Sequence, residues 1–218
     1  MEQRERTFAT GEIYHLYGRG VAKQSIFADD HDREHFLLAA QYYLEAEPSG
    51  RFAVALKSGQ LDKLLAHHPK QPLVEVLAYC LMENHFHLVV RQLNDVGIST
   101  FMRRTLVSYT RYYNMRHHRV GPLFQGVFQS VHVETEAQFL HLTRYVHLNA
   151  YVAKLVDWPV DYRWSSYPAY VRGEVSRLVH PELILWISGG PDRYREFVEE
   201  YASYVRDLAF IKDLLKEE

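Results

Sequence analysis

The chain has few of the residues that would place it outside the cell or in a membrane. Cys80 is the only cysteine among 218 residues, so no disulfide can form within the chain. No apolar run reaches membrane-spanning length, and Met1–Arg6 lacks the apolar core of a secretory signal. We therefore expect a cytoplasmic globular protein without a membrane partner, with Cys80 in the core and not acting as a nucleophile.

The chain also lacks an excess of charge of either sign. It has 25 Lys and Arg residues against 27 Asp and Glu residues, a formal net charge of −2. This balance excludes a polycation, so a protein of this charge that binds nucleic acid has to concentrate its cations locally. Such a concentration exists between Arg103 and Arg119, which contains five arginines and two histidines.

The most informative stretch is Asn84–Val90, which reads Asn-His-Phe-His-Leu-Val-Val. Alternation along a β-strand puts His85 and His87 on one face, with the apolar residues between them on the other. Two imidazoles on one face of a strand can bind a divalent metal. The competing interpretation is a half-buried strand whose polar face happens to carry two histidines.

Hydrophobic periodicity and turn signals predict alternating strands and helices. The predicted strands cover 12–18, 74–82, 85–91 and 123–133, and the predicted helices cover 31–46, 98–119, 135–154 and 193–216. Residues 51–72 are interpreted as an insertion with a short strand over 52–56 and a small helix near 61–67. This order predicts an α+β fold, an antiparallel sheet with helices on one face and an open opposite face that carries His85 and His87.

The helix over 135–154 carries Tyr145 and Asn149 four residues apart, so both side chains lie on one flank, one turn apart. Considered alone, Tyr145 reads as a core residue and Asn149 as a surface residue. His147 reads as a surface residue or one next to a site, and His15 as a structural strand residue.

Five segments in this order resemble the single-tyrosine transposases of the smallest insertion sequences, and among them the REP-associated tyrosine transposases. The segments are Tyr14-His15…Arg19-Gly20…Gln24-Ser25-Ile26-Phe27, Met82-Glu83-Asn84-His85-Phe86-His87, Gly121-Pro122-Leu123-Phe124-Gln125-Gly126, Tyr145-Val146-His147-Leu148-Asn149 and Tyr162-Arg163-Trp164-Ser165-Ser166-Tyr167. The resemblance covers about residues 12–172. It implies a ferredoxin-like fold of the HUH endonuclease class and cutting and rejoining of single-stranded DNA.

The resemblance also implies residue roles. His85 and His87 match the metal-binding histidines, Tyr145 matches the nucleophile, and Asn149 matches the polar residue that completes the metal site. A phenol oxygen that attacks phosphorus forms a phosphotyrosine and conserves the bond energy. The expected metal is Mg²⁺ or Mn²⁺, since an amide oxygen suits a hard cation and imidazoles favour Mn²⁺.

The expected partner is single-stranded or hairpin DNA from a repeat element, bound by a monomer or homodimer near the nucleoid. In this context Arg103, Arg104 and Arg111 are predicted to contact phosphates. Arg19 is predicted to meet the DNA backbone, and His141, one turn before Tyr145, to touch substrate. We further expect a transposase-like domain over 1–175 and a helical extension over 176–218 that packs on the domain or on a partner.

Two other functions stay open at this point. The first is a relative that binds structured DNA or RNA without cutting, favoured by Val127-Phe128-Gln129, where relatives often carry two cations. The second is an unrelated metalloenzyme in which a carboxylate such as Glu134 joins the two histidines.

Overall fold

A computed structural model describes residues 7–176 and 178–214. Its centre is a four-stranded antiparallel sheet with the strand order β2-β3-β1-β4. The strands are β1 (Ile13–Arg19), β2 (Val74–Met82), β3 (His85–Gln92) and β4 (Gln129–Val133). This order, together with helices between β1 and β2 and between β3 and β4, is the ferredoxin-like arrangement. The predicted fold class is confirmed.

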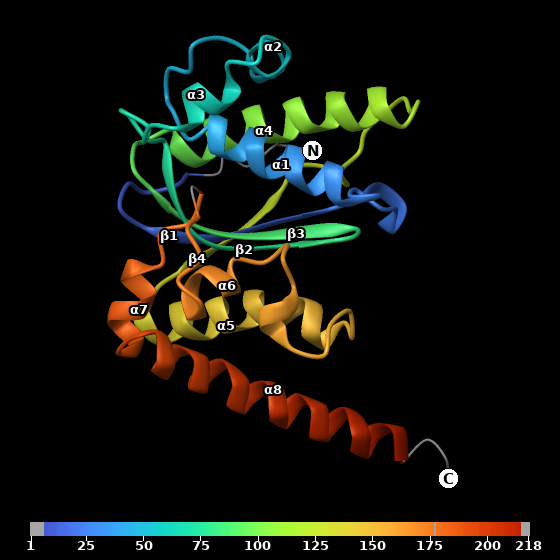
Figure 1. Ribbon diagram of the computed structural model, residues 1–218, viewed down its shortest axis with the longest axis vertical. Helices are drawn as coiled ribbons and strands as arrows, with labels where there is room; N and C mark the ends of the chain where they lie inside the picture. Colours follow the sequence, from blue (N-terminus) through green and yellow to red (C-terminus); the bar gives the residue numbers. More distant parts are fainter. Residues whose placement is uncertain (1–6, 177, 215–218) are drawn as a thin grey trace.

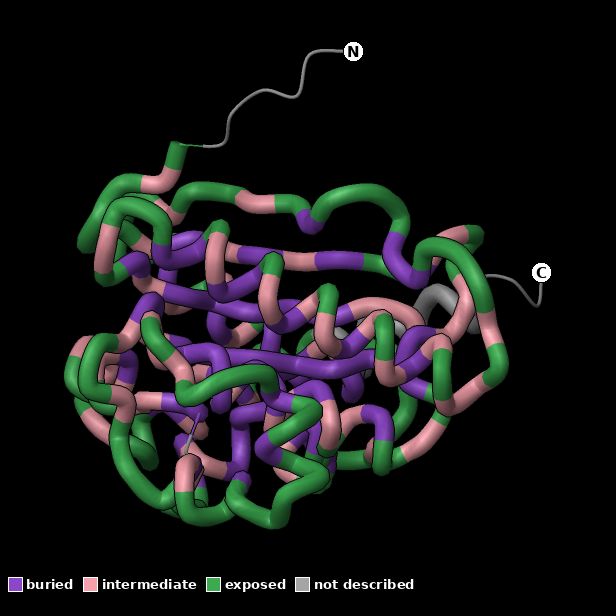
Figure 2. Tube along the Cα trace, turned by 90° about the horizontal axis from the view of Figure 1, so that it is seen from above, coloured by how far each residue is buried: buried purple, intermediate pink, exposed green. Residues whose placement is uncertain are grey.

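Helices cover both faces of the sheet (Figure 1). α1 (Asp30–Tyr42) and α4 (Gly97–Arg116) lie on one face, and α5 (Glu136–Val152) lies on the other, with α8 (Pro191–Leu214) outside α5. The short helices are α2 (Phe52–Lys57), α3 (Leu61–Leu65), α6 (Tyr167–Val171) and α7 (Glu182–Ser188), with 3₁₀ turns η1 (Val21–Lys23) and η2 (Pro159–Asp161). Buried residues concentrate in the sheet between the two helical layers (Figure 2).

The strands divide their side chains between these two layers. Phe86 of β3 faces α1, where its ring lies 5.5 Å from that of Phe36. The alternate residues His85 and His87 therefore face α5. The register pairs His87 with Cys80 of β2, which is fully buried as predicted, and burial raises the pKa of its thiol to about 12.

The expectation of an open sheet face is wrong. α5 has apolar residues such as Phe139, Val146 and Leu148 that are at most 2 % exposed, and β2 presents apolar residues toward α5. Burial of these two apolar surfaces against each other is favourable, so the helix that carries Tyr145 packs on its own sheet.

Several elements also differ in type or extent from the predictions. Residues 52–57 form a helix and not a strand, because Phe52 and Ala55 point inward at helical spacing. β4 begins at Gln129 and not at 123, since the preceding residues form turns that contain only the single bridge from Gly20 to Phe124. α7 was not predicted. The predicted end of the last helix at Lys216 lies outside the described residues.

The segment after α5 covers the free edge of β2. The Leu81 amide donates to the Trp164 carbonyl and the Ser166 amide donates to the Tyr79 carbonyl. His147 is completely buried beneath this segment, with its ring nitrogens 2.8 Å from the hydroxyls of Tyr194 and Ser166. The interpretation of His147 as a surface residue or one next to the site is therefore wrong, because it joins α5 to α8 and to the edge segment.

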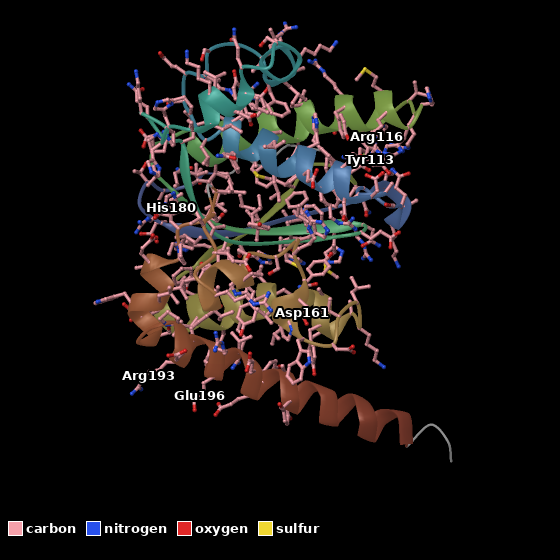
Figure 3. All side chains as sticks on the ribbon, in the orientation of Figure 1. Tyr113, Arg116, Asp161, His180, Arg193 and Glu196 are labelled. Carbon is pink, nitrogen blue, oxygen red and sulfur yellow. The ribbon has the colours of Figure 1, made fainter. Side chains whose placement is uncertain are left out.

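An ion-pair network joins α1 to α4 on the opposite side of the sheet. Arg116, at the end of α4 in Figure 3, donates to the buried carboxylate of Asp32 at 2.6 Å and to Asp29. The Nε2 atom of His117 lies 2.9 Å from Asp32. One arginine of the predicted basic segment is therefore used to hold two helices together.

The stability of the chain is expected to decrease as the pH falls from 7 to 4, in part through His35. Its ring stacks on Tyr112 at a centroid distance of 3.5 Å, and burial lowers its pKa from 6.5 to about 4. The unfolded chain takes up a proton on His35 near pH 6.5, whereas the folded chain takes it up only near pH 4. The stabilisation that comes from keeping this ring neutral is therefore complete above about pH 6.5 and is lost progressively down to about pH 4. At roughly 1.4 kcal/mol per pKa unit, this shift corresponds to about 3.5 kcal/mol. Because the His35 ring is only partly buried, solvent screens the effect, and the expected loss is on the order of 2 kcal/mol.

Thermal unfolding followed by circular dichroism at pH 7 and pH 4.5 measures this effect. His35→Phe keeps the ring stack but cannot titrate, so its melting temperature should fall less than that of the wild type. Equal decreases in the two proteins would contradict the assignment.

Candidate active site

Side chains from two strands and one helix meet on the α5 face of the sheet. His85 and His87 come from β3, His15 and Tyr17 from the neighbouring β1, and Tyr145 and Asn149 from α5. α5 is capped by Thr135, whose hydroxyl accepts a hydrogen bond from the Gln138 amide. Because residues four apart share a helix flank, α5 brings Tyr145 and Asn149 together to the two histidines.

The distances confirm that these residues form one cluster. The ring centroids of His85 and His87 are 5.1 Å apart, and the Tyr145 ring lies edge-on to His87 at 5.5 Å. The Nε2 atom of His85 is 3.4 Å from the Oδ1 atom of Asn149, while its Nδ1 atom is 2.7 Å from Asn84 Oδ1. His85 and Asn149, which are 64 positions apart in the chain, thus lie side by side.

The imidazoles of the cluster are held in the neutral form. Burial lowers the pKa of His87 to about 3 and that of His15 to about 4, and burial also lowers the pKa of His85. Desolvation disfavours the charged ring, and the neighbouring histidines add to the effect at His87. At neutral pH each ring therefore keeps one nitrogen lone pair, which is the form that binds metals.

The donor atoms fit a divalent cation. The Nε2 atom of His87 is buried and has no hydrogen-bond partner, an arrangement that is unfavourable unless another group supplies one. The Nε2 atom of His85 and the amide oxygen of Asn149 are the other two donors that the cluster offers. Two imidazoles and one amide oxygen suit Mn²⁺ or Mg²⁺.

A carboxylate ligand does not complete this set. Within residues 7–176 and 178–214, no three His, Cys, Asp or Glu side chains gather in a way that could hold a metal. Glu134 therefore does not join His85 and His87, and the alternative of an unrelated metalloenzyme built on these three residues is wrong. The third protein ligand available at this site is Asn149.

Tyr145 is accessible for reaction. Its side chain is 54 % exposed although its ring contacts His87 and His15, whereas most of the large aromatic residues lie in the core. The interpretation of Tyr145 as a core residue is therefore wrong. Arg19, at the end of β1, is exposed and pairs in register with His85, where its charge helps to lower the pKa of that ring. A cation thus lies beside the cluster.

The other predicted DNA-binding residues lie elsewhere. Arg103, Arg104 and Arg111 are on α4, which is across the sheet from Tyr145 (Figure 1). Arg104 donates to the backbone carbonyls of Glu45 and Ala46, while Arg103 and Arg111 are exposed.

His141 lies on the outer part of α5. Its Nδ1 atom is 2.8 Å from Arg144, and the Arg144 guanidinium is 4.2 Å from the ring centroids of both Phe197 and Tyr201 of α8. The residues around His141 thus fasten α8 to α5.

The prediction of site residues missed Tyr17 and assigned His15 only a structural role. Both alternate with buried residues of β1, so their side chains share the face of His87, and the Tyr17 ring lies 6.1 Å from that of His87. The signal was the spacing of two between positions 15 and 17, the same period that placed His85 and His87 together. The pairing of β1 with β3 had to be known before this signal could be used.

Residues 52–149 match the family model described as IS200-like transposase, a range that includes both histidines, Tyr145 and Asn149. Over these residues, which are less than half of the chain, it is similar to the IS200-like transposases. This finding agrees with the resemblance inferred from the motifs, and the similarity supports a transposase-like role in DNA processing.

A solved structure, described as a REP-associated tyrosine transposase bound to a REP hairpin, has a similar fold. Its TM-score with this chain is 0.52 at 12 % sequence identity, and the match covers 83 % of this chain and 92 % of the other. At this low sequence identity, the comparison shows that the two folds are similar and no more than that. A comparison with curated proteins finds no match. None of the described helices is long and apolar enough to cross a bilayer.

Proposed function

We propose that the protein is a metal-dependent endonuclease and strand transferase that acts on single-stranded DNA through Tyr145. The observation that carries this proposal is the position of the exposed Tyr145 phenol beside His87, with the two ring centroids 5.5 Å apart. The His87 imidazole is buried and neutral, and its Nε2 atom has no hydrogen-bond partner. Incubation with labelled hairpin DNA and Mn²⁺ should give a covalent protein–DNA adduct that resists denaturation.

The proposed step is a transesterification that needs no external energy source. The Tyr145 oxygen attacks the scissile phosphorus, the new bond is the phosphotyrosine ester, and the bond to the 3′ oxygen breaks. The phenol proton leaves to solvent, and the released 3′ oxygen takes up a proton. The product is a 5′-phosphotyrosine and a free 3′-hydroxyl, and attack by another 3′-hydroxyl reverses the step and joins strands.

The residues of the cluster have separate tasks in this proposal. His85, His87 and Asn149 would hold the cation, and a bound Mg²⁺ or Mn²⁺ would polarise the scissile phosphate and offset the charge that develops on it. α5 positions the phenol and the amide oxygen on the same side of the sheet. Arg19, exposed beside His85, binds a phosphate of the substrate.

One chain supplies all the residues of the proposed site. Tyr145 lies beside the histidines of its own sheet, and α5 is fixed there by α8 and by the buried His147. We therefore propose that Tyr145 acts in its own subunit, so that a monomer is sufficient for cleavage. In this view residues 1–175 form the catalytic domain and the extension over 176–218 packs on it.

The proposed substrate is a hairpin next to a single-stranded segment, from a repeat element of the nucleoid. The similar solved structure is described as bound to a REP hairpin, and α4 offers a surface suited to a duplex stem. Arg103, Val107, Arg111 and Met115 form an exposed ridge along this helix at intervals of four residues. Two arginines on such a ridge neutralise phosphates without reading sequence.

Removal of both exposed arginines should weaken hairpin binding without changing the chemistry. Arg103→Gln with Arg111→Gln is expected to reduce affinity about 10-fold at low salt and to lower the slope of log K against log salt by about 2. The matched control is Arg193→Gln, an exposed arginine at the start of α8 on the far side of the molecule (Figure 3). An unchanged salt slope, measured by fluorescence anisotropy, would show that DNA does not contact this ridge.

The second candidate function is binding of structured DNA or RNA without cleavage. The segment Val127-Phe128-Gln129 favours it, because Phe128 is 8 % exposed and no cation occupies these positions. Such a protein would bind hairpins equally well with and without a chelator and would form no adduct. The adduct assay in Mn²⁺ and in EDTA separates the two functions.

A further inference from the structure

His15 contacts the candidate metal ligand His87 from the neighbouring strand. The two rings are nearly parallel, with centroids 5.1 Å apart and an interplanar angle of 19°. The Nε2 atom of His15 lies 2.9 Å from the Nδ1 atom of His87, which is hydrogen-bond distance. His87 is 6 % exposed, so water has little access to this contact.

The direction of this hydrogen bond decides which nitrogen of His87 is free. If His87 donates through Nδ1–H, its Nε2 atom carries a lone pair and can bind a cation. If His15 donates instead, a neutral His87 ring carries its proton on Nε2, where no acceptor lies among the described residues. A buried N–H group without an acceptor costs about 1–3 kcal/mol, and such groups are rarer in proteins than unpaired acceptors. The first direction is therefore favoured even before a cation binds.

We propose that His15 is a positioning residue, which accepts the Nδ1–H of His87 and so directs the Nε2 lone pair of His87 toward the cation. This inference rests on the metal site of the proposed function. His15 acts through His87 and not as a ligand, since its own Nε2 atom is engaged in this hydrogen bond. A hydrogen bond to the second ring nitrogen orients a metal-binding histidine and raises its basicity.

The tautomer of His87 can be measured without any metal. In ¹⁵N-labelled wild-type protein, the long-range ¹H–¹⁵N correlations of His87 should show the Nδ1–H form. His15→Gln keeps an acceptor near the position of Nε2 and should preserve this form. His15→Phe keeps the ring stack but removes the acceptor, so His87 should become a mixture of tautomers. A wild-type His87 in the Nε2–H form would overturn the inference. This measurement uses the wild-type protein, so it does not depend on whether a variant folds.

Metal affinity gives the second readout. Titration with Mn²⁺, followed by electron paramagnetic resonance, should show affinity 10- to 100-fold weaker in His15→Phe and within about threefold of wild type in His15→Gln. The matched control is His132→Phe, since His132 is a sheet histidine on the other face, paired with Glu12. Its Mn²⁺ affinity should not change.

The outcomes separate this inference from the proposed function. If the wild-type chain does not bind Mn²⁺, the proposed metal site fails and the inference fails with it. If the wild type binds Mn²⁺ and His15→Phe binds it equally well, the inference fails and the metal site stands. A melting temperature that falls in His15→Phe with unchanged metal affinity would show a purely structural role.

Discussion

Replacement of Tyr145 with phenylalanine is expected to abolish the covalent adduct with single-stranded hairpin DNA. The substitution removes one oxygen from a side chain that is 54 % exposed, so it should not affect folding. Removal of a nucleophile typically lowers the rate of such enzymes by a factor of 10⁴ or more, so we expect cleavage to fall at least about 10⁴-fold. Hairpin affinity should be unchanged, because the variant keeps the cation, the arginines and the aromatic ring.

The control for this experiment is Tyr204→Phe. Tyr204 is 57 % exposed and lies on α8, so it is a phenol of similar accessibility at a different place. It should form the adduct at the wild-type rate. An adduct that persists in Tyr145→Phe refutes the assignment of the nucleophile, and its mapping by mass spectrometry would identify the residue responsible.

Replacement of His87 with alanine is expected to weaken Mn²⁺ binding and so to remove most of the cleavage activity at a fixed Mn²⁺ concentration. The variant removes the donor atom that is buried without a partner and leaves only His85 and Asn149 to hold a cation. We expect Mn²⁺ affinity to fall by about 100-fold or more. The loss of a residue that only hydrogen-bonds to a metal ligand typically costs about 10–100-fold, and here the ligand itself is removed. Adduct formation at fixed Mn²⁺ should fall in parallel and should recover partly at millimolar Mn²⁺.

His67→Ala is the control for this second experiment. His67 is an exposed histidine just after α3, across the sheet from the site. Its removal should change neither Mn²⁺ affinity nor adduct yield. If His87→Ala cleaves DNA at the wild-type rate and metal dependence, then the two strand histidines do not hold the metal that the reaction uses.

The sequence predicted the sheet well because its strands have a strong local signal. The strand over 74–82 is apolar apart from Glu75, and the strand after Glu83-Asn84 carries its two histidines with period two, so both were placed within one residue. The faces of His85 and His87 followed directly from this alternation. The starts of α1 and α5 lie within one residue of the predicted starts, and there Asp29 and Thr135 each accept a hydrogen bond from the amide three residues later.

Long-range packing could not be predicted in the same way. No local signal showed that α5 would cover the sheet face expected to be open, since that depends on how the helix returns to its own sheet. For the same reason His147 read as peripheral, although its two hydrogen bonds are to residues 19 and 47 positions away. The role of His15 also depends on strand pairing, because its partner His87 is 72 residues away.

The candidate nucleophile and the amide ligand are one turn apart on a single rigid helix that α8 holds through Arg144. A displacement of α5 from the sheet would therefore withdraw both side chains at once, and neither could leave while the other stayed. Assembly and loss of the site are thus concerted. Anything that loosens the contact between α5 and α8 changes the fraction of molecules competent to react, and leaves the rate of each competent molecule the same.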